Sequence, residues 1–285
     1  IFAESENDTY GLDAEDVLKK ITSNTVAVMP IHYGGCGARD IEKIQQICRQ
    51  RNLFLFEDAA QSLGSKIKGK KIGTFGDAAM FSLCQNKIIT SGEGGIIVTD
   101  KKEVYEKLRL IRSHGRVELS EDYFSNTKDN DYIEVGYNYR MSTMTAALAS
   151  SQLKKIGMLI KIRQEKAKYF NEMLGSITNL KLPIPPENFE HVYQMYTLLL
   201  NSEKERNELQ EFLKSKGIMT KVYFNPIHLK TLYQSKFGYH TDDLPNTEDL
   251  SKRVLTLPFY ANISLEEMKY VGSMIKLFYE NWEVN

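Results

Sequence analysis

Residues 52–62 read Asn-Leu-Phe-Leu-Phe-Glu-Asp-Ala-Ala-Gln-Ser, an apolar run that ends at Phe56 with two carboxylates, Glu57 and Asp58, directly after it. An apolar run without polar alternation predicts a strand that is buried on both faces, as in a parallel sheet. In open α/β sheets, ligands bind beyond the carboxyl ends of the strands, so Glu57 or Asp58 is well placed for a site. The alternative, in which one of them caps the next helix, stays open.

Segments on both sides of this stretch alternate between helical and strand patterns. Residues 13–21 have apolar positions at helical spacing behind Asp13, a residue that favours the N-cap position. Further helices are predicted over 39–51 and 101–113, and strands over 25–30, 52–56, 78–83 and 95–99. Helices that alternate with buried strands predict an α/β fold around a largely parallel sheet.

The pattern changes around residues 183–186, which read Pro-Ile-Pro-Pro. Before this point, residues 142–174 are predicted to form one or two long helices in which the chain leaves the first domain. Beyond it, strands are predicted over 192–200 and 218–224, and helices over 203–216, 246–255 and 264–279. We therefore expect a large domain over 1–158 and a smaller α+β domain over 159–285.

The composition excludes several classes of function. The 285 residues contain 37 Lys and Arg against 37 Asp and Glu, so no excess of positive charge indicates a nucleic-acid partner. No apolar run reaches the roughly 18 residues that a membrane span needs. The three cysteines lack the spacing of a metal site or a disulfide framework, which favours a reducing compartment. We expect a cytoplasmic protein with no metal, nucleic-acid or membrane partner.

A lysine and a glycine-rich turn lie between the last two predicted strands. Residues 80–95 read Met-Phe-Ser-Leu-Cys-Gln-Asn-Lys-Ile-Ile-Thr-Ser-Gly-Glu-Gly-Gly, which places Lys87 just past an apolar run. A lysine attacks carbonyl groups when its surroundings lower its pKa, and glycines allow the backbone to approach a ligand closely. A tight hairpin with a solvated lysine explains the same pattern equally well.

A third polar segment precedes the predicted helices of residues 142–174. Residues 136–141 read Gly-Tyr-Asn-Tyr-Arg-Met. Asn138 and Arg140 could bind an anion near a helix N-terminus, and a structural turn is the competing explanation.

Together these segments resemble the DegT/DnrJ/EryC1/StrS family of pyridoxal-phosphate-dependent sugar aminotransferases. The matching residues, in the order of that family, are Glu57-Asp-Ala-Ala-Gln61, Phe81-Ser82, Asn86-Lys87, Gly92-Glu-Gly-Gly95, His114-Gly115 and residues 136–141, and also Pro30-Ile-His-Tyr-Gly34, Gln152-Leu153, Tyr223, Pro226-Ile-His-Leu229, Leu244-Pro245 and Leu257-Pro258. The resemblance covers nearly the whole chain. It implies the aspartate aminotransferase fold, with a three-layer large domain, a mostly parallel mixed sheet and a smaller C-terminal α+β domain.

The resemblance also implies roles for five residues. Lys87 would hold pyridoxal 5'-phosphate through an imine and would then move protons as general acid and base. Asp58 would pair with the pyridine nitrogen, Gln61 would bind the phenolic oxygen, and Ser82 would bind the phosphate. Asn138 would bind the phosphate in the neighbouring subunit, which implies a homodimer with a shared active site.

Three further residues match family positions near the site and are weaker candidates for substrate binding. They are His32, Glu93 and His228. A hydrogen-bonded structural histidine competes with substrate binding for His228, and a stabilised turn competes with it for Glu93.

The implied reaction moves an amino group from an amino acid, with glutamate expected, to a nucleotide-linked keto-sugar for amino-sugar or polysaccharide biosynthesis. A sugar dehydratase of the same family is an alternative, but such relatives carry histidine where this chain has Lys87. A second alternative is a catalytically silent relative that binds a sugar nucleotide or has a regulatory role. The presence of Lys87 and Asp58 argues against it. The family's phosphate cup and ring-stacking residue have no counterpart in this sequence, so we expect the large domain to be incomplete at its N-terminus.

Overall fold

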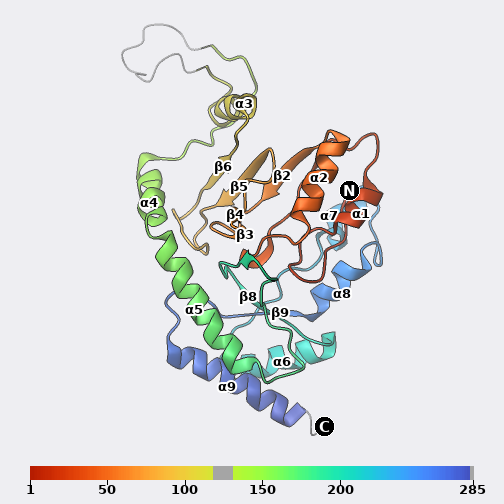
Figure 1. The fold of residues 1–285 in the computed structure, drawn as a ribbon, viewed down its shortest axis with the longest axis vertical. Helices are drawn as coiled ribbons and strands as arrows, with labels where there is room; N and C mark the ends of the chain where they lie inside the picture. Colours follow the sequence, from red (N-terminus) through yellow and green to blue (C-terminus); the bar gives the residue numbers. More distant parts are fainter. Residues whose placement is uncertain (118–130, 283–285) are drawn as a thin grey trace.

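The computed structural model describes residues 1–117 and 131–282, and it is organised around a four-stranded sheet (Figure 1). The strands lie in the order β1 (Ala27–Val28), β2 (Phe54–Asp58), β5 (Ala78–Ser82) and β6 (Gly95–Val98). The first three are parallel, and β6 is antiparallel to β5. This arrangement confirms the predicted α/β class and its mostly parallel, mixed sheet.

Two helices close one face of this sheet. They are α1 (Ala14–Lys20), whose first turn is capped by Asp13, and α2 (Ile41–Arg51). Their apolar stripes pack against the strand residues that point the same way, and the buried cluster includes Val17, Ile41, Ile44, Cys48, Leu55, Ala79 and Phe81. Each large apolar side chain buried here contributes about 1.5–3 kcal/mol. We call this the closed face.

The opposite face of the sheet, which we call the open face, carries apolar side chains that remain exposed. Phe54 is 48% exposed, Met80 40% and Ile97 53%. Because side chains alternate along a strand, Asp58 and Ser82 lie on this same face, beyond Phe54 and Met80 on their strands. The open face therefore brings together two of the predicted site residues.

The second half of the chain builds a separate buried core below the sheet in Figure 1. Helix α3 (Lys102–Arg112) stands out beyond the sheet, and α4 (Thr143–Leu153) and α5 (Ile156–Leu174) lead from there to the second core. That core packs α5, α6 (Glu203–Ser215), α9 (Leu265–Trp282) and the antiparallel pair β8 (Tyr196–Leu199) and β9 (Val254–Leu257). The division of the chain at residues 158 and 159 stays a prediction.

The remaining elements are short. They are β3 (Lys66–Ile67), β4 (Lys70–Lys71), β7 (Phe189–Glu190), α7 (Thr231–Phe237), α8 (Pro245–Arg253) and the 3₁₀ turns Tyr33–Gly35 and Ile227–Leu229. Strand β3 pairs with both β4 and β7, so residues 189–190 join the half of the chain that precedes them. Among the described helices, none combines the length and the apolar character that crossing a bilayer requires.

One predicted element of the second half was wrong, and another ended slightly earlier than predicted. Residues 218–224 form no strand, and only an isolated bridge joins Lys221 to Thr256. The helix predicted over 246–255 ends at Arg253, where the chain enters β9 at once. On the edge of β9 that β8 leaves free, Lys221 pairs with Thr256, but this single bridge does not extend into a ladder with the rest of residues 218–224.

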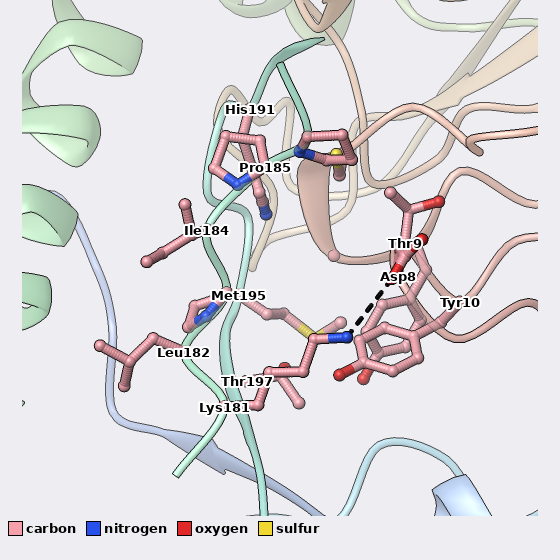
Figure 2. A pocket seen from close by; sticks show the side chains of 15 residues that line it. Asp8, Thr9, Tyr10, Lys181, Leu182, Ile184, Pro185, His191, Met195 and Thr197 are labelled. Atoms are coloured by element: carbon pink, nitrogen blue, oxygen red, sulfur yellow. Dashed lines mark hydrogen bonds and ion pairs between the residues drawn. The ribbon is translucent and has the colours of Figure 1, made fainter. Parts of the chain in front are cut away.

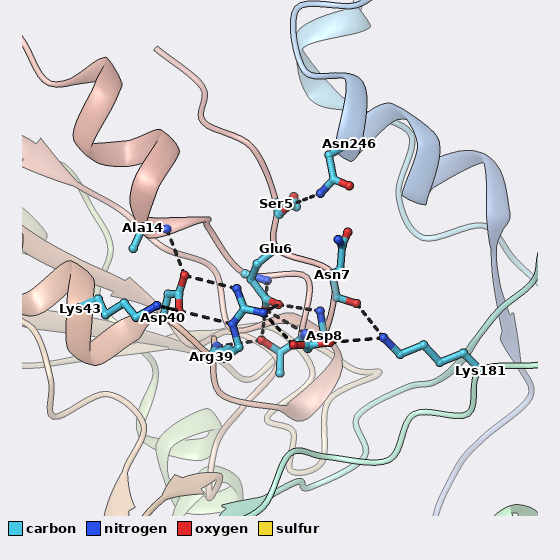
Figure 3. Close-up of polar contacts among 12 residues, drawn as sticks. Ser5, Glu6, Asn7, Asp8, Ala14, Arg39, Asp40, Lys43, Lys181 and Asn246 are labelled. Atoms are coloured by element: carbon cyan, nitrogen blue, oxygen red, sulfur yellow. Dashed lines mark hydrogen bonds and ion pairs between the residues drawn. The ribbon is translucent and has the colours of Figure 1, made fainter.

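A polar network holds the N-terminal segment between the two halves of the chain (Figure 3). Arg39 of the loop before α2 pairs with Asp8 at 2.7 Å and lies 3.8 Å from buried Glu6. The hydrogen bond from Arg39 holds the pKa of Asp8 below its usual value. From the other side, Lys181 Nζ donates to the Asn7 carbonyl at 3.1 Å. Residues 6–8 therefore contact both halves of the molecule.

Candidate active site

Glu57 is a structural carboxylate at the end of β2. It is 1% exposed, and its two oxygens accept hydrogen bonds from the backbone N–H groups of Gly73, Phe75 and Gly76 and from His32 Nε2, at 2.6–3.0 Å. Burial alone would raise the pKa of Glu57, but the hydrogen bonds from His32 and from this backbone hold it below its usual value. Glu57 has no capacity left for a ligand.

Asp58, the next residue, points to the open face and is only partly buried. Its Oδ1 accepts a hydrogen bond from Ala60 N at 3.0 Å, and among the described residues it forms no ion pair. Its backbone is fixed by bonds of 2.9 Å to Pro30 and His32. The structure therefore selects Asp58 over Glu57 as the carboxylate that is available for chemistry.

Lys87 lies in a loop, residues 83–94, that connects β5 to β6. Leu83 closes the base of this loop, since its N–H donates to Gly94 O at 2.9 Å and its carbonyl accepts from Ser91 N at 3.0 Å. Burial lowers the pKa of Lys87 below the usual lysine value, and its electrostatic interactions with Cys84 and Asp58 partly offset this. A lysine whose pKa is lowered by burial supplies a neutral amine near physiological pH more readily than a solvated lysine does.

Ser82 and Gln61 flank this arrangement. Ser82 ends β5 on the open face, and its Oγ accepts a bond from Cys84 N at 3.3 Å. Gln61 follows Asp58 by three residues, and its Oε1 accepts from Gly34 N at 2.7 Å. That contact leaves the amide N–H groups of Gln61 available to a ligand.

The two candidate histidines are held inside the protein. His32 is fully buried, with Nε2 on Glu57 at 3.0 Å and Nδ1 accepting from Ala38 N at 2.9 Å. His228 is 1% exposed, and its Nε2 lies 2.9 Å from Glu248 Oε1. These contacts favour structural roles, in which both histidines fix neighbouring segments.

Glu93 lies in the turn that leads into β6. Its carbonyl accepts a bond from Ser91 Oγ at 2.9 Å, and its side chain is exposed. The flanking Gly92 and Gly94 have φ values of 85° and 154°, which residues with a side chain rarely adopt. The glycines thus explain the turn, and substrate binding by Glu93 stays a prediction.

Asn138 lies on an exposed arm, residues 131–141, between α3 and α4. Its Oδ1 accepts a hydrogen bond from Arg140 Nε at 3.1 Å. The rings of Tyr137 and Tyr139 stack at 5.0 Å and are 55% and 69% exposed. The side-chain contact that the structure shows for Asn138 lies within this arm. It involves none of Asp58, Ser82 and Lys87.

A small cavity lies elsewhere, between residues 8–10 and 181–197 (Figure 2). Its volume is about 30 Å³, enough for about two water molecules. Tyr10, Met195 and Ile184 line it, but Lys87 does not. This cavity is too small for an organic substrate, and it borders the candidate site at Gly34, whose N–H donates to Gln61.

Sequence reasoning missed one residue that touches the lysine loop. Gln194 is 8% exposed, and its Nε2 donates to the Asn86 carbonyl at 2.7 Å. A single glutamine in the run 192–200 carries no motif, and its partner lies 108 residues away in sequence. Only the folded chain reveals this contact.

Lys87 has a lowered pKa and lies near Asp58, at the carboxyl end of parallel strands. This arrangement indicates an α/β enzyme whose chemistry depends on a lysine. The chain belongs to the DegT/DnrJ/EryC1/StrS aminotransferase family, whose model matches residues 1–276. Enzymes of this family depend on pyridoxal 5'-phosphate. The predicted family and the predicted class of PLP-dependent aminotransferase are thus confirmed.

Three relatives illustrate the match. An uncharacterised protein of Methanocaldococcus jannaschii is 35% identical over 284 residues, which are 97% of this chain and 72% of that protein. A GDP-perosamine synthase of Escherichia coli O157:H7 is 34% identical over 281 residues, 99% of this chain and 73% of that one. The structure of Helicobacter pylori PseC, an aminotransferase of pseudoaminic acid biosynthesis, superposes with a TM-score of 0.90 at 29% identity, covering 99% of this chain and 74% of that one.

The residues present fit the cofactor. Asp58 is partly buried, lies on the open face and forms no ion pair within the described part of the chain, which suits a protonated ring nitrogen. Lys87 supplies the amine that an aldehyde requires, and Ser82 supplies a hydroxyl on the same face as Asp58.

Proposed function

We propose that this chain moves an amino group from an amino acid, with glutamate as the expected donor, to a keto-sugar that is linked to a nucleotide. The chain is then a PLP-dependent sugar aminotransferase of amino-sugar biosynthesis. The names of the E. coli and H. pylori relatives support a sugar acceptor, and the first also supports a nucleotide carrier. The three free cysteines support a reducing compartment, for which we propose the cytoplasm.

One observation carries the proposal: burial lowers the pKa of Lys87, and the charge of the nearby Asp58 carboxylate acts on the same amine. When bound, the cofactor supplies a ring that withdraws electrons from the reacting carbon of the substrate. Asp58 keeps the ring nitrogen protonated, because a carboxylate stabilises the adjacent positive charge. In each half of the reaction, the Nζ of Lys87 would move a proton between the reacting carbon of the substrate and the cofactor.

Gln61 and Ser82 would hold the rest of the cofactor in place. Gln61 has its carbonyl oxygen committed to Gly34 N, which fixes the amide and leaves its N–H groups to bind the phenolic oxygen. Ser82 offers its hydroxyl to the phosphate at the end of β5. His32, Glu93 and His228 remain weaker candidates for substrate contacts.

The active form would be a homodimer in which Asn138 reaches the site of the partner. The arm 131–141 supports this, because it exposes several large side chains, including Val135 at 81%, Tyr137 and Tyr139. Exposed aromatic residues of this kind are typical of the centre of protein interfaces. The side chain of Asn138 contacts its own arm and not Lys87, which is the arrangement expected if it serves another subunit.

Reduction with borohydride in the presence of pyridoxal phosphate tests this function. We expect the cofactor to become fixed to the peptide that contains Lys87, and Lys87→Ala to remain unlabelled. Attachment at another lysine, or at none, would contradict the proposed chemistry. With glutamate and a 4-keto nucleotide sugar, an aminated product supports amine transfer, whereas a deoxygenated product would support the dehydratase.

A further inference from the structure

In the described structure, one hydrogen bond ties the tip of the lysine loop to a distant segment, while Ile88 and Ile89 beside it pack in a buried cluster with Val192 and Ala149. Within the tip, Lys87 N donates to the Cys84 carbonyl at 3.1 Å, which forms a local turn. Among the hydrogen bonds of the described residues, one joins positions 85–88 to a distant part of the chain. It is the 2.7 Å bond from Gln194 Nε2 to the carbonyl of Asn86, the residue directly before Lys87.

Gln194 belongs to residues 191–195, a segment that we call the strap. The strap donates backbone hydrogen bonds of 2.9 and 3.0 Å to the carbonyls of Gly35 and Gly34. The fit is close, because a Cβ atom on Gly35 would lie 2.6 Å from Gln194 N. Gly34 N in turn donates to Gln61, so the strap is connected through Gly34 to one of the proposed cofactor residues.

Helix α5 holds the strap from its other side. Arg163 Nη1 donates to the Tyr193 carbonyl at 2.8 Å, and Gln164 Nε2 donates to the His191 carbonyl at 3.0 Å. The strap therefore has hydrogen bonds at His191, Val192, Tyr193 and Met195, four of its five residues, and its own position is well defined. A side chain that projects from such a segment transmits that position to whatever it binds.

We propose that Gln194 is a positioning residue that holds the Asn86 carbonyl and thereby sets the place of Lys87 in the site. This rests on the proposed role of Lys87. The bond needs a donor, since the group it holds is a carbonyl, and it needs the full length of glutamine to reach from the strap. A lysine that must accept a proton from a bound substrate loses rate steeply when it is displaced by about 1 Å.

Gln194→Met tests this proposal, because methionine has a similar length but no donor. The first readout is the labelling rate of the Lys87 amine by acetic anhydride across pH, in the purified chain without added cofactor, with peptide mass spectrometry. We expect the midpoint to move up by about half a pH unit or more, because a freed loop tip leaves Lys87 less buried. In the loaded enzyme, we expect kcat to fall about 10-fold while KM for glutamate changes less than about twofold.

Gln164→Met is the matched control, since it removes the same kind of amide-to-carbonyl bond from the same strap but not from the lysine loop. We expect it to leave the labelling midpoint and kcat unchanged. If Gln194→Met does not fold, Gln194→Leu also removes the donor without adding a charge, and the same shift is expected. An unchanged midpoint in the Gln194 variants, or an equal shift in Gln164→Met, would overturn the proposal. Labelling does not depend on the cofactor, so a failure of the proposed function would show in the borohydride experiment instead.

Discussion

The two faces of the central sheet use the same strands in different ways. On the closed face, Leu55 and Phe81 are at most 8% exposed, and Glu57 between them has four hydrogen-bond donors. On the open face, Phe54 remains 48% exposed, and Asp58 has a single donor. Adjacent carboxylates of one strand thus have opposite surroundings, because successive side chains point to opposite faces.

This difference separates a structural from a chemical role. A buried carboxylate whose oxygens are all satisfied contributes to stability and offers nothing to a ligand. A partly buried carboxylate with capacity left, near an amine of lowered pKa, is the arrangement typical of catalytic sites. Substitutions on the open face should therefore change activity, and those on the closed face should change stability.

The largest effect is expected for Lys87→Ala on the open face. Loss of the amine removes both the attachment point of the cofactor and the base, so kcat should fall by at least about 10³–10⁴-fold. The free energy of unfolding should change by less than about 1 kcal/mol, because the side chain forms no ion pair within the described residues. Steady-state kinetics and urea unfolding measure the two effects. Lys101→Ala, which removes an ion pair with Asp77, is the control and should retain activity. If Lys87→Ala were active, the assignment of Lys87 as the catalytic lysine would be wrong.

Asp58→Asn should give the next largest loss. Asparagine keeps the shape but cannot stabilise a positive charge on the ring nitrogen, so kcat should fall about 10²–10³-fold. The free energy of unfolding should stay within about 0.5 kcal/mol of the parent. The same kinetic and unfolding measurements apply. If Asp58→Asn unfolds more easily than Glu57→Gln, the assignment of the two carboxylates is reversed.

Glu57→Gln should cost about 3 kcal/mol of unfolding free energy and leave kcat of the folded enzyme within about threefold. The amide N–H of glutamine would face backbone N–H donors, of which Gly73, Phe75 and Gly76 supply three. Chemical denaturation at neutral pH measures this cost. A loss of activity without a loss of stability would mean that Glu57 acts in the reaction.

The same variant has a defined dependence on pH. The pKa of Glu57 is lower in the folded than in the unfolded state, so its contribution to stability is present above the unfolded value of about 4.3. That contribution disappears as pH falls through the lower, folded value. The stability gap between parent and Glu57→Gln should therefore be constant near neutrality and narrow below about pH 4. A gap that widened in acid would contradict this sign.

The sequence predicted the class of fold and the edge of the sheet at which the site lies. Continuous apolar runs ending in polar residues placed Asp58 and Lys87 at the carboxyl ends of neighbouring strands. The residue pattern alone left Glu57 and Asp58 undecided, because either phase of alternation is compatible with an apolar run, and only the family resemblance assigned Asp58. Which of the two carboxylates is buried depends on which face of the sheet α1 and α2 cover, and that is a property of the tertiary structure.

Other features depended on long-range contacts in the same way. Strand β9 follows α8 directly, with no turn residues between them. The local sequence pattern therefore predicted a helix that continued two residues too far. Residues 218–224 have the composition of a strand but only one bridge, at Lys221. Gln194 matters through a partner that no local pattern indicates.

The smallest effect is expected for Phe54→Ala on the open face, compared with Phe81→Ala on the closed face. Phe81 is 8% exposed, so its truncation should cost about 3–5 kcal/mol of unfolding free energy. Phe54 is half exposed, stacks on Phe56 with ring centroids 6.1 Å apart and has Lys101 Nζ 5.3 Å from its ring centroid, so its truncation should cost about 1 kcal/mol or less. Urea unfolding of the two variants at several protein concentrations gives the comparison. A cost at Phe54 close to that at Phe81 would mean that another polypeptide covers the open face in solution. If that cost also grew with protein concentration, the covering polypeptide would be a second copy of this chain.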